Sequence, residues 1–225
     1  MRSCIFLFAF FIFVSSLLEA EIPSSEVLVY DILYKGLKVG EATLEFKGQV
    51  EYRKEKAYLV IFKVDTLYFK DTEKIFASSQ FLPLVVERHL KPLIGVSEYI
   101  REEYDQKKFK VNITKKNPFF GKKICIHKKN FIHNAILLSY HLRLLENLEK
   151  MRSKKITLPT QEFTLINEGI KLVDIGSEKK EAVVIKSKSP KFILWFSNDD
   201  RKIPLRIEES SLGGYCFILK EMEVN

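Results

Sequence analysis

The stretch VYDILYKGLKVGEATLEF, Val29–Phe46, decides the fold of this chain of 225 residues. It reads as two apolar segments joined through a turn that contains Gly36 and Gly40. From Ala42 to Phe46 every second residue is apolar and the residues between them are polar, so one face of the segment is apolar and the other is polar. This alternation predicts a half-buried antiparallel strand and, with the segment before the turn, a β-hairpin.

Most of the remaining chain repeats this pattern. Short segments rich in Val, Ile, Tyr, Phe and Thr alternate with breaks rich in Gly, Pro, Asn, Asp or Lys. The predicted strands span residues 27–34, 40–46, 57–65, 69–77, 84–90, 96–104, 108–114, 161–175, 182–188, 192–197, 203–208 and 215–222. We therefore expect a mainly β fold with one amphipathic helix: a strongly curved antiparallel sheet or open β-barrel, with the helix packed on one face or end.

Two segments depart from the strand pattern. Between Phe131 and Met151 apolar residues recur at helical spacing and polar residues collect on the opposite side, which predicts the amphipathic helix. Asn130 and Asn134 are the candidates to cap its start. The basic run Lys107–Lys129 is the least regular part of the chain, and we interpret it as a loop that crosses from the first strands to the helix.

The N-terminus has the composition of a secretory signal peptide. Arg2 precedes an unbroken apolar run, Ile5–Val14, which the small residues Ser15, Ser16 and Ala20 follow, although Leu18 and Glu19 make the cleavage site imperfect. The run is shorter than the roughly 20 residues that a membrane span needs. We expect residues 1–20 to be a signal peptide cleaved between residues 16 and 21, with retention as an anchor as the alternative. Residues 21–225 would then form one exported, periplasmic domain.

The chain is basic, with a formal net charge of +8 at pH 7. Its lysines are spread from Lys35 to Lys220, which is typical of a solvated surface. Because export removes the protein from nucleic acid, we expect no nucleic-acid partner. Contact with a membrane is expected to be at most peripheral once the signal peptide has been removed.

Cysteine and histidine side chains suggest two sites, and both have a plain alternative. Cys125 and Cys216 could form a disulfide that closes a long loop, whereas their apolar neighbours are equally typical of buried free thiols.

A metal site is the second possibility, because Cys125 also lies near three histidines, His127, His133 and His141. The last two are eight residues apart, about two turns on the predicted helix, so they are badly placed to share an ion. We expect no metal site and no cofactor.

The sequence contains none of the short motifs that mark common catalytic sites. It has no Gly-x-Ser-x-Gly elbow, no Gly-rich phosphate loop and no His-Glu-x-x-His motif. We therefore expect no catalytic residue. The carboxylates of Glu41, Asp71 and Glu73 could nevertheless converge in the fold, and a cleft with such carboxylates at shifted pKa values would point to a hydrolase.

The aromatic content favours a binding function. The chain holds 18 phenylalanines, and a concave sheet lined with such side chains can hold an apolar ligand, although the same side chains would also serve to fill the core. We predict a lipid or another amphipathic ligand, with Glu41, Arg143, Trp195 and Arg206 as its candidate contacts and the two arginines facing an anionic headgroup. The alternative is a structural or assembly protein that binds another envelope protein through a strand edge or the helix.

Several stretches, in this order, resemble one family of bacterial exported proteins, the domain of unknown function DUF3108. The hairpin Tyr30–Ala42 is similar to the family's opening strand and its Gly-(Ile/Leu)-x-x-Gly-Glu-Ala turn. The helical stretch AILLSYHLR, Ala135–Arg143, resembles a Ser-x-x-Tyr-x-x-Arg segment of the family, with the serine displaced to the position before the tyrosine. Weaker similarities are found in Leu67–Glu73, Leu82-Pro83, Glu87–His89, Trp195–Asp200, Pro204–Ile207 and Gly214–Leu219.

The resemblance covers most of the chain after the predicted signal peptide. It implies an exported, mainly β domain of the cell envelope, and it transfers no catalytic residue. It also implies that Gly36, Gly40, Tyr140 and Pro204 form a structural fingerprint. In this interpretation the two glycines permit turn conformations that other residues resist.

Overall fold

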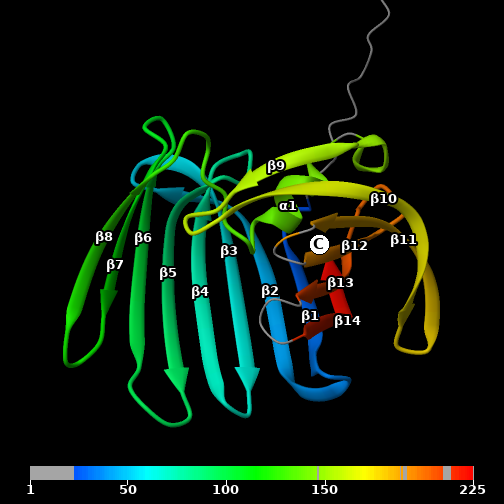
Figure 1. Cartoon of the computed structure of the whole chain (residues 1–225), viewed down its shortest axis with the longest axis horizontal. Helices are drawn as coiled ribbons and strands as arrows, with labels where there is room; N and C mark the ends of the chain where they lie inside the picture. The colour runs from blue at the N-terminus through cyan, green and yellow to red at the C-terminus, as the bar shows by residue number, and fades with distance from the viewer. Residues whose placement is uncertain (1–22, 146, 188, 190–191, 210–213, 225) are drawn as a thin grey trace, which may run out of the picture.

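The computed structural model describes residues 23–145, 147–187, 189, 192–209 and 214–224. The predicted signal peptide, residues 1–20, lies outside the described residues. Strands make up 66% of the chain, which confirms the predicted mainly β fold with one helix. Figure 1 shows the strands as one broad sheet with the helix packed on it.

All fourteen strands belong to one antiparallel sheet that is not closed. The first eight, in chain order, are β1 Glu26–Tyr34, β2 Leu37–Tyr52, β3 Glu55–Thr66, β4 Phe69–Ala77, β5 Pro83–Pro92, β6 Glu98–Asp105, β7 Lys110–Lys116 and β8 Gly121–His127. The others are β9 Ser153–Thr157, β10 Glu162–Ile175, β11 Glu178–Ser187, β12 Phe192–Ser197, β13 Pro204–Glu209 and β14 Tyr215–Val224.

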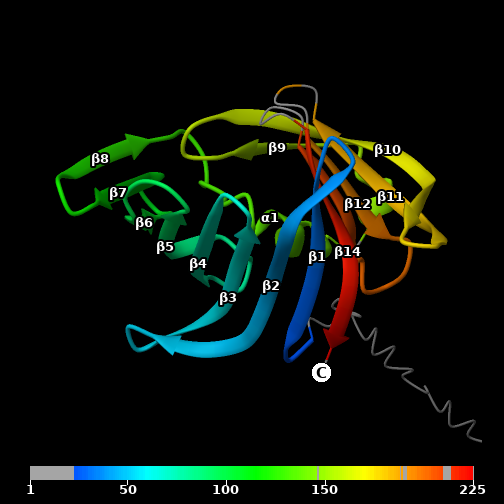
Figure 2. The same ribbon diagram turned by 90° about the horizontal axis from the view of Figure 1, so that it is seen from below.

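The strand order shows how the sheet is built from two meanders. Strands β1 to β8 pair in sequence, strands β9 to β14 do the same, and pairing of β1 with β14 joins the two series. The end strands β8 and β9 are therefore the two edges of the sheet. Seen from below, the sheet curves around the helix (Figure 2). We call the face that contacts the helix the inner face and the opposite face the outer face.

The stretch Val29–Phe46 forms most of the β1–β2 hairpin. In its register Tyr30 lies opposite Ala42 and Leu28 lies opposite Leu44. These four side chains are all buried on the inner face, while the residues between them point outward because successive side chains of a strand alternate. The predicted alternation is therefore confirmed, and it fixes which face of the sheet becomes the core.

The two glycines of this hairpin do different things. Gly36 lies in the turn with φ +83, a conformation that other residues rarely adopt. Gly40 lies where β2 passes closest to β3: a Cβ atom on it would lie 2.3 Å from the backbone oxygen of Asp65. Here the close approach of two strands, and not a turn, requires glycine.

A substitution at Gly40 is expected to destabilise the protein even though its backbone is ordinary. Gly40→Ala forces β2 and β3 apart, and we expect a loss of about 1–3 kcal/mol in the free energy of unfolding, as for other overpacked sites. Urea denaturation of the variant and of wild type measures it. Gly121→Ala is the matched control, since a Cβ there meets nothing nearer than 3.7 Å. Equal stability of the Gly40→Ala variant and wild type would contradict this account of the glycine.

The helix is much shorter than predicted. The structure contains helix α1, Leu138–Arg143, and a 3-10 turn η1, Leu148–Lys150, in place of one helix over residues 131–151. Asn134 does begin the helical region, since its side-chain oxygen accepts the backbone N–H groups of Ile136 and Leu137 at 2.9 and 3.2 Å. The apolar spacing marked Leu137, Tyr140 and Leu148 correctly as buried, but Ser139 and Arg143, which it assigned to the polar side, are buried too, and a continuous helix was the wrong conclusion.

Helix α1 joins two hydrophobic cores. Leu137 and Tyr140 belong to the larger core with strands of the first meander. Leu138 and Leu142 belong to a second core with β9 to β12. The Tyr140 ring is stacked on the ring of Phe81, with centroids 5.0 Å apart. The short helix therefore ties the two meanders together from the inner side.

The basic run Lys107–Lys129 is not a loop, which corrects our interpretation. It contains the hairpin of β7 and β8, whose register places Ile113 opposite Ile124. Sequence reasoning missed two strands, β8 and β9. Lysines fill several positions of each, so only one or two apolar residues show the alternation that marks a strand.

The disulfide considered for Cys125 and Cys216 is not formed. Both cysteines are free. Cys125 lies on the edge strand β8, and Cys216 lies on β14 in the middle of the sheet, eight strand positions away. A disulfide requires Cα atoms within about 7 Å, so this topology keeps the two thiols apart.

Candidate functional site

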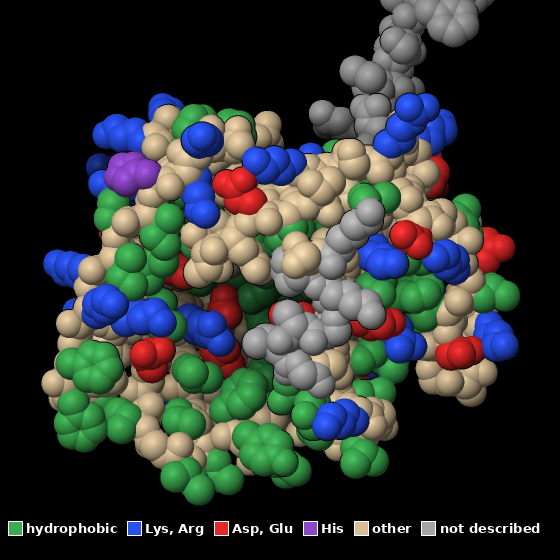
Figure 3. Space-filling view, viewed as in Figure 1, with side chains coloured by type: hydrophobic (Ala, Val, Ile, Leu, Met, Phe, Trp, Pro, Cys, Tyr) green, Lys and Arg blue, Asp and Glu red, His purple; other side chains and the backbone are tan. Residues whose placement is uncertain are grey.

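Part of the inner face is apolar and only half-buried. The side chains of Phe62, Phe69, Leu90, Phe217 and Leu219 are of this kind. Register places them on the inner face: Phe62 lies opposite Leu44 of the core, Leu90 lies opposite Asp71, and the residues of β14 lie opposite Tyr30 and Ile32. Figure 3 shows a hollow on this side of the molecule, with acidic side chains inside it.

Charged residues of β4 and β5 lie in the same region. Glu73 is directly opposite Arg88 in the register, and Asp71 is two residues away on the same face. The Arg88 guanidinium binds Asp71 through two nitrogens, with Nε 2.8 Å from Oδ2, and lies 3.4 Å from Oε1 of Glu73. Asp71 and Glu73 are nearly buried, with side chains 6% and 12% exposed.

Strand β6 adds two further groups, Glu102 and Tyr104. The Tyr104 hydroxyl donates a hydrogen bond to Glu102, and Tyr104 is buried. Burial, with the nearby carboxylate of Glu102, raises the pKa of the Tyr104 hydroxyl, so it stays protonated at neutral pH. We refer to Asp71, Glu73, Arg88, Glu102 and Tyr104 together as the Arg88 cluster.

The Arg88 cluster holds three carboxylates and one guanidinium, and this imbalance changes the protonation of Glu73. Burial is the main cause, with the charges of Asp71 and Glu102 adding to it, and together they raise the pKa of Glu73 to about 7 despite the opposing effect of Arg88. At neutral pH this carboxyl is therefore about half protonated. It can donate or accept a hydrogen bond as a bound polar group requires.

Two of the three carboxylates singled out in the sequence converge here. Asp71 and Glu73 share Arg88, whereas Glu41 points to the other face, opposite Asp31 and Asp65. Its carboxylate is held by Lys38 and Lys220 at 2.8 and 3.1 Å, and these lysines lower its pKa.

Arg143 is placed where no ligand headgroup can use it. Its guanidinium forms two hydrogen bonds with the carboxylate of Glu26, at 2.7 and 2.9 Å, and its Nε donates to the backbone oxygen of Arg201 at 3.0 Å. Glu26 is completely buried. The structure therefore does not support the predicted role of Arg143 as a ligand contact, because each of its three guanidinium nitrogens already donates to a protein oxygen and its side chain is only 10% exposed.

Trp195 and Arg206 lie beside each other in the register, on the outer face. Both contact Glu208: the indole N–H donates to its carboxylate at 3.1 Å, and the guanidinium of Arg206 forms an ion pair with it at 2.8 Å. Arg206 and Lys220 also line a surface hollow of about 550 Å³ that the β10–β11 turn forms with β14. The structure thus brings Trp195, Arg206 and Glu41 to the outer face, and none of them reaches the concave inner face for which they were predicted.

The fingerprint residues of the C-terminal half lie in the core. The Tyr30 hydroxyl donates to the backbone oxygen of Pro204 at 2.9 Å. Tyr140 is buried and lies under the guanidinium of Arg143, whose carbon is 5.3 Å from the ring centroid. The first of these contacts connects β1 with β13, and the second lies within α1.

The histidines are closer together than the sequence suggested. Because His133 precedes the short helix, its ring lies 5.1 Å from the ring of His141, centroid to centroid, beside a hollow of about 460 Å³. Burial lowers the pKa of His133 to about 4, so it is neutral at pH 7. In the part of the chain that the structure describes, no three His, Cys, Asp or Glu side chains are placed to hold a metal ion.

Sequence reasoning missed three members of the site, Arg88, Glu102 and Tyr104, as well as the pair of Glu26 with Arg143. One signal was visible in the sequence of β4: Asp71 and Glu73 alternate in step with Ile75 and Ala77, so all four face the same side of the sheet. Two carboxylates on this apolar face require a buried partner of opposite charge. The identity of the partner depends on strand register.

The comparisons add no relative. Among the described residues no helix is long and apolar enough to cross a membrane. No protein-family model matches the chain, and no curated protein or solved structure matches it either. The similarity to DUF3108 therefore remains a prediction, and function is argued from the geometry of the inner face.

Proposed function

We propose that this protein binds an amphipathic molecule, such as a lipid or glycolipid, on the inner face of its curved sheet. The proposal rests on one observation: apolar side chains of the inner face lie beside a cluster of buried charged groups. Three half-buried apolar side chains, Phe62, Phe69 and Leu90, adjoin the buried polar Arg88 cluster: Phe62 lies opposite Glu73, and Leu90 lies opposite Asp71. Phe217 and Leu219 add half-buried apolar surface to the same face on β14, beyond β1 and β2. Ligand sites commonly combine an apolar lining with a few fixed polar groups in this way.

The charge of the Arg88 cluster selects the polar part of the ligand. Arg88 is already bound by Asp71 through two nitrogens, so the cluster offers acceptors and the half-protonated carboxyl of Glu73 and carries excess negative charge. A hydroxyl or amine group fits these partners better than a phosphate does. We therefore replace the expected anionic headgroup with a neutral or cationic one, such as a sugar or an ethanolamine.

The cellular setting belongs to the same proposal. The first 20 residues have the composition of a signal peptide, and this supports export to the periplasm and a role in the cell envelope. A binding role, without catalysis, agrees with the absence of the common catalytic motifs from the sequence.

A titration with a fluorescent lipid analogue tests the site. Leu90→Trp places a bulky ring on the inner face and is expected to weaken binding at least about tenfold, which corresponds to about 1.4 kcal/mol. Thr43→Trp adds the same ring on the outer face, where Thr43 lies opposite Lys63, and is expected to leave the affinity unchanged. Equal affinities of the two variants would place the ligand elsewhere.

Two other functions each have one observation in their favour. The open sheet leaves β8 and β9 as edges, and an edge can bind a strand of another envelope protein. Lys122 and Lys123 on β8 oppose this, since charged edges discourage strand pairing.

The second alternative is a hydrolase, because the pKa of Glu73 near 7 suits general acid–base catalysis. Turnover of ester or glycoside substrates that is lost in Glu73→Gln would favour the hydrolase over a binding protein.

A further inference from the structure

Exposed apolar side chains concentrate at one end of the sheet. Thirteen large hydrophobic side chains are exposed among the described residues, and eight of them lie at four successive hairpin tips of the first meander. We call these eight the apolar rim: Leu37, Leu67, Tyr68, Leu93, Ile94, Val96, Phe119 and Phe120. Several are highly exposed, with Ile94 at 90% and Phe119 at 79%. Figure 3 shows hydrophobic side chains along the corresponding lower edge of the molecule.

The opposite end of the same meander provides an internal comparison. Its turns join β2 to β3, β4 to β5 and β6 to β7, and in this described part of the chain they carry none of the exposed large hydrophobic side chains. Arg53 and Lys54 form the first of these turns, and Phe81 in the second is buried. The apolar rim is therefore a property of one end of the sheet and not of hairpin turns in general.

Lysines lie directly behind the apolar rim. Two cross-strand pairs at this end join like charges, Lys70 opposite Lys91 and Lys115 opposite Lys122, an arrangement that weakens a sheet by itself. Lys70 is neutralised by Asp65 at 2.6 Å. Among the described residues no acidic side chain forms an ion pair with Lys91, Lys115, Lys116, Lys122 or Lys123. The other acidic side chains near this end are Glu98, Asp71, which pairs with Arg88, and Asp31 and Glu41, which pair with Lys38.

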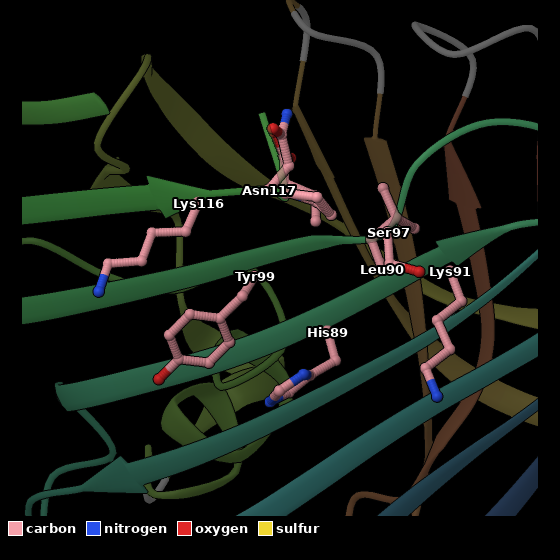
Figure 4. Close-up of a pocket in the computed structure, with 9 residues that line it drawn as sticks. His89, Leu90, Lys91, Ser97, Tyr99, Lys116 and Asn117 are labelled. Carbon is pink, nitrogen blue, oxygen red and sulfur yellow. The ribbon is translucent and has the colours of Figure 1, made fainter. Parts of the chain in front are cut away.

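A shallow pocket connects the lysines to the rim. It has a volume of about 260 Å³ and is lined by residues that include Lys91, Tyr99, Lys116 and Asn117, with Glu98 as the one acidic residue against two lysines. Figure 4 shows the side chains of His89, Lys91, Tyr99 and Lys116 projecting to the same side of the sheet. Two unpaired ammonium groups and a phenol beside exposed apolar tips are chemically suited to a phosphate at the boundary of an apolar phase.

We propose that the apolar rim docks this protein onto a bilayer that contains anionic phospholipid. The four tips are separate projections spread over seven strand spacings, roughly 30 Å along the edge. A flat, deformable interface can receive all of them at once, whereas a protein partner would need a matching groove for each. Apolar side chains backed by lysines match the acyl and headgroup layers of an anionic membrane. Docking does not depend on ligand binding by the inner face.

Vesicle flotation tests the proposal with protein purified from the periplasm of an expressing bacterium, so that processing of the N-terminus is the same in every sample. Wild type is expected to float with vesicles of phosphatidylethanolamine and phosphatidylglycerol, and less with vesicles of phosphatidylcholine alone. A rim variant, with Leu67→Ser, Ile94→Ser, Phe119→Ser and Phe120→Ser, is expected to lose at least about tenfold in partition coefficient. These side chains are exposed, so folding should be unaffected.

Matched variants separate the rim from general surface properties. Serine at Phe131, Ile170 and Leu172, which are exposed outside the rim, is expected to change partitioning less than twofold. Glutamine at Lys115, Lys116, Lys122 and Lys123 should reduce binding to anionic vesicles about tenfold and flatten its salt dependence, and glutamine at Lys56, Lys107, Lys128 and Lys129 should not.

Three results would overturn the docking proposal: wild type that stays unbound, a rim variant that floats like wild type, or equal losses in the rim and control variants. Self-association that disappears in the rim variant, without flotation of wild type, would assign the rim to a second copy of this chain. Phosphatidylethanolamine belongs to the class of ligand proposed for the inner face, so the Leu90→Trp variant, which blocks that face, is floated in parallel and is expected to partition like wild type. A loss in Leu90→Trp as large as the loss in the rim variant would assign vesicle binding to the inner face and overturn docking by the rim.

Discussion

Replacing Arg143 by methionine is expected to lower the free energy of unfolding by about 3–5 kcal/mol, the usual cost of removing one partner of a buried ion pair. Glu26 is fully buried, and both of its oxygens accept from Arg143. The variant leaves this carboxylate in the core without a partner and removes the bond to the backbone of Arg201. Urea denaturation at neutral pH measures the loss.

A double-mutant cycle shows whether the loss comes from the broken pair. Glu26→Gln with Arg143→Met removes both charges, and this double variant is expected to be more stable than Arg143→Met alone, because no buried charge remains. Arg152→Met, at an exposed arginine, should change stability by less than about 0.5 kcal/mol. Strictly additive effects of the two substitutions would show that Glu26 and Arg143 are not coupled.

Glu73→Gln is expected to stabilise the protein at pH 8 and to leave it nearly unchanged at pH 5. The folded protein raises the pKa of Glu73 to about 7 from its ordinary value of 4.5. Between these two values the folded state binds more protons than the unfolded state, so stability falls as pH rises through this window. Above pH 7 the ionised carboxylate costs up to about 3 kcal/mol, and glutamine removes that cost.

Denaturation of wild type and Glu73→Gln from pH 4 to 8 gives the two stability curves. They should separate progressively between about pH 4.5 and 7, with the variant above. Glu55→Gln, at an exposed position of β3, serves as the control and should follow wild type throughout. Parallel curves, or a variant less stable at pH 8, would show that Glu73 is an ordinary ionised carboxylate that Arg88 holds.

The sheet could be predicted from the sequence where a strand has one buried face. In the β1–β2 hairpin the inward positions from Leu28 to Phe46 are apolar and buried, so the alternation and the fold agree. Strand β9 has only Ile156 as an apolar residue, and β8 is lysine-rich at its start. Short edge strands of this kind need few buried side chains, and their sequences therefore carry little signal.

The helix shows what apolar spacing does and does not determine. Leu137, Tyr140 and Leu148 were predicted to face the core, and all three are buried. The chain reaches these positions through a six-residue helix and a 3-10 turn. Spacing indicates which side chains face inward, whereas the continuity of the helix depends on the space that the surrounding sheet leaves.

The site could be predicted only in part, because its contacts span the chain. Convergence of Asp71 and Glu73 was a sequence hypothesis, but the partner Arg88 is 17 residues away and is brought there by the register of β4 and β5. Glu26 and Arg143 are separated by 117 residues. Glu41, Trp195 and Arg206, expected to contact a ligand in the concave face, lie on the outer face for the same reason: the alternation of side chains along a strand is visible in the sequence, but which side faces inward depends on the whole sheet.

Native mass spectrometry of the protein purified from a bacterial periplasm, before and after organic extraction, tests the central proposal most directly. We predict one bound molecule of lipid size per chain, removed by extraction, restored by envelope lipids and absent from the Leu90→Trp variant. A mass equal to that of the protein alone, unchanged after envelope lipids are added, would contradict the proposal that the inner face is a ligand site.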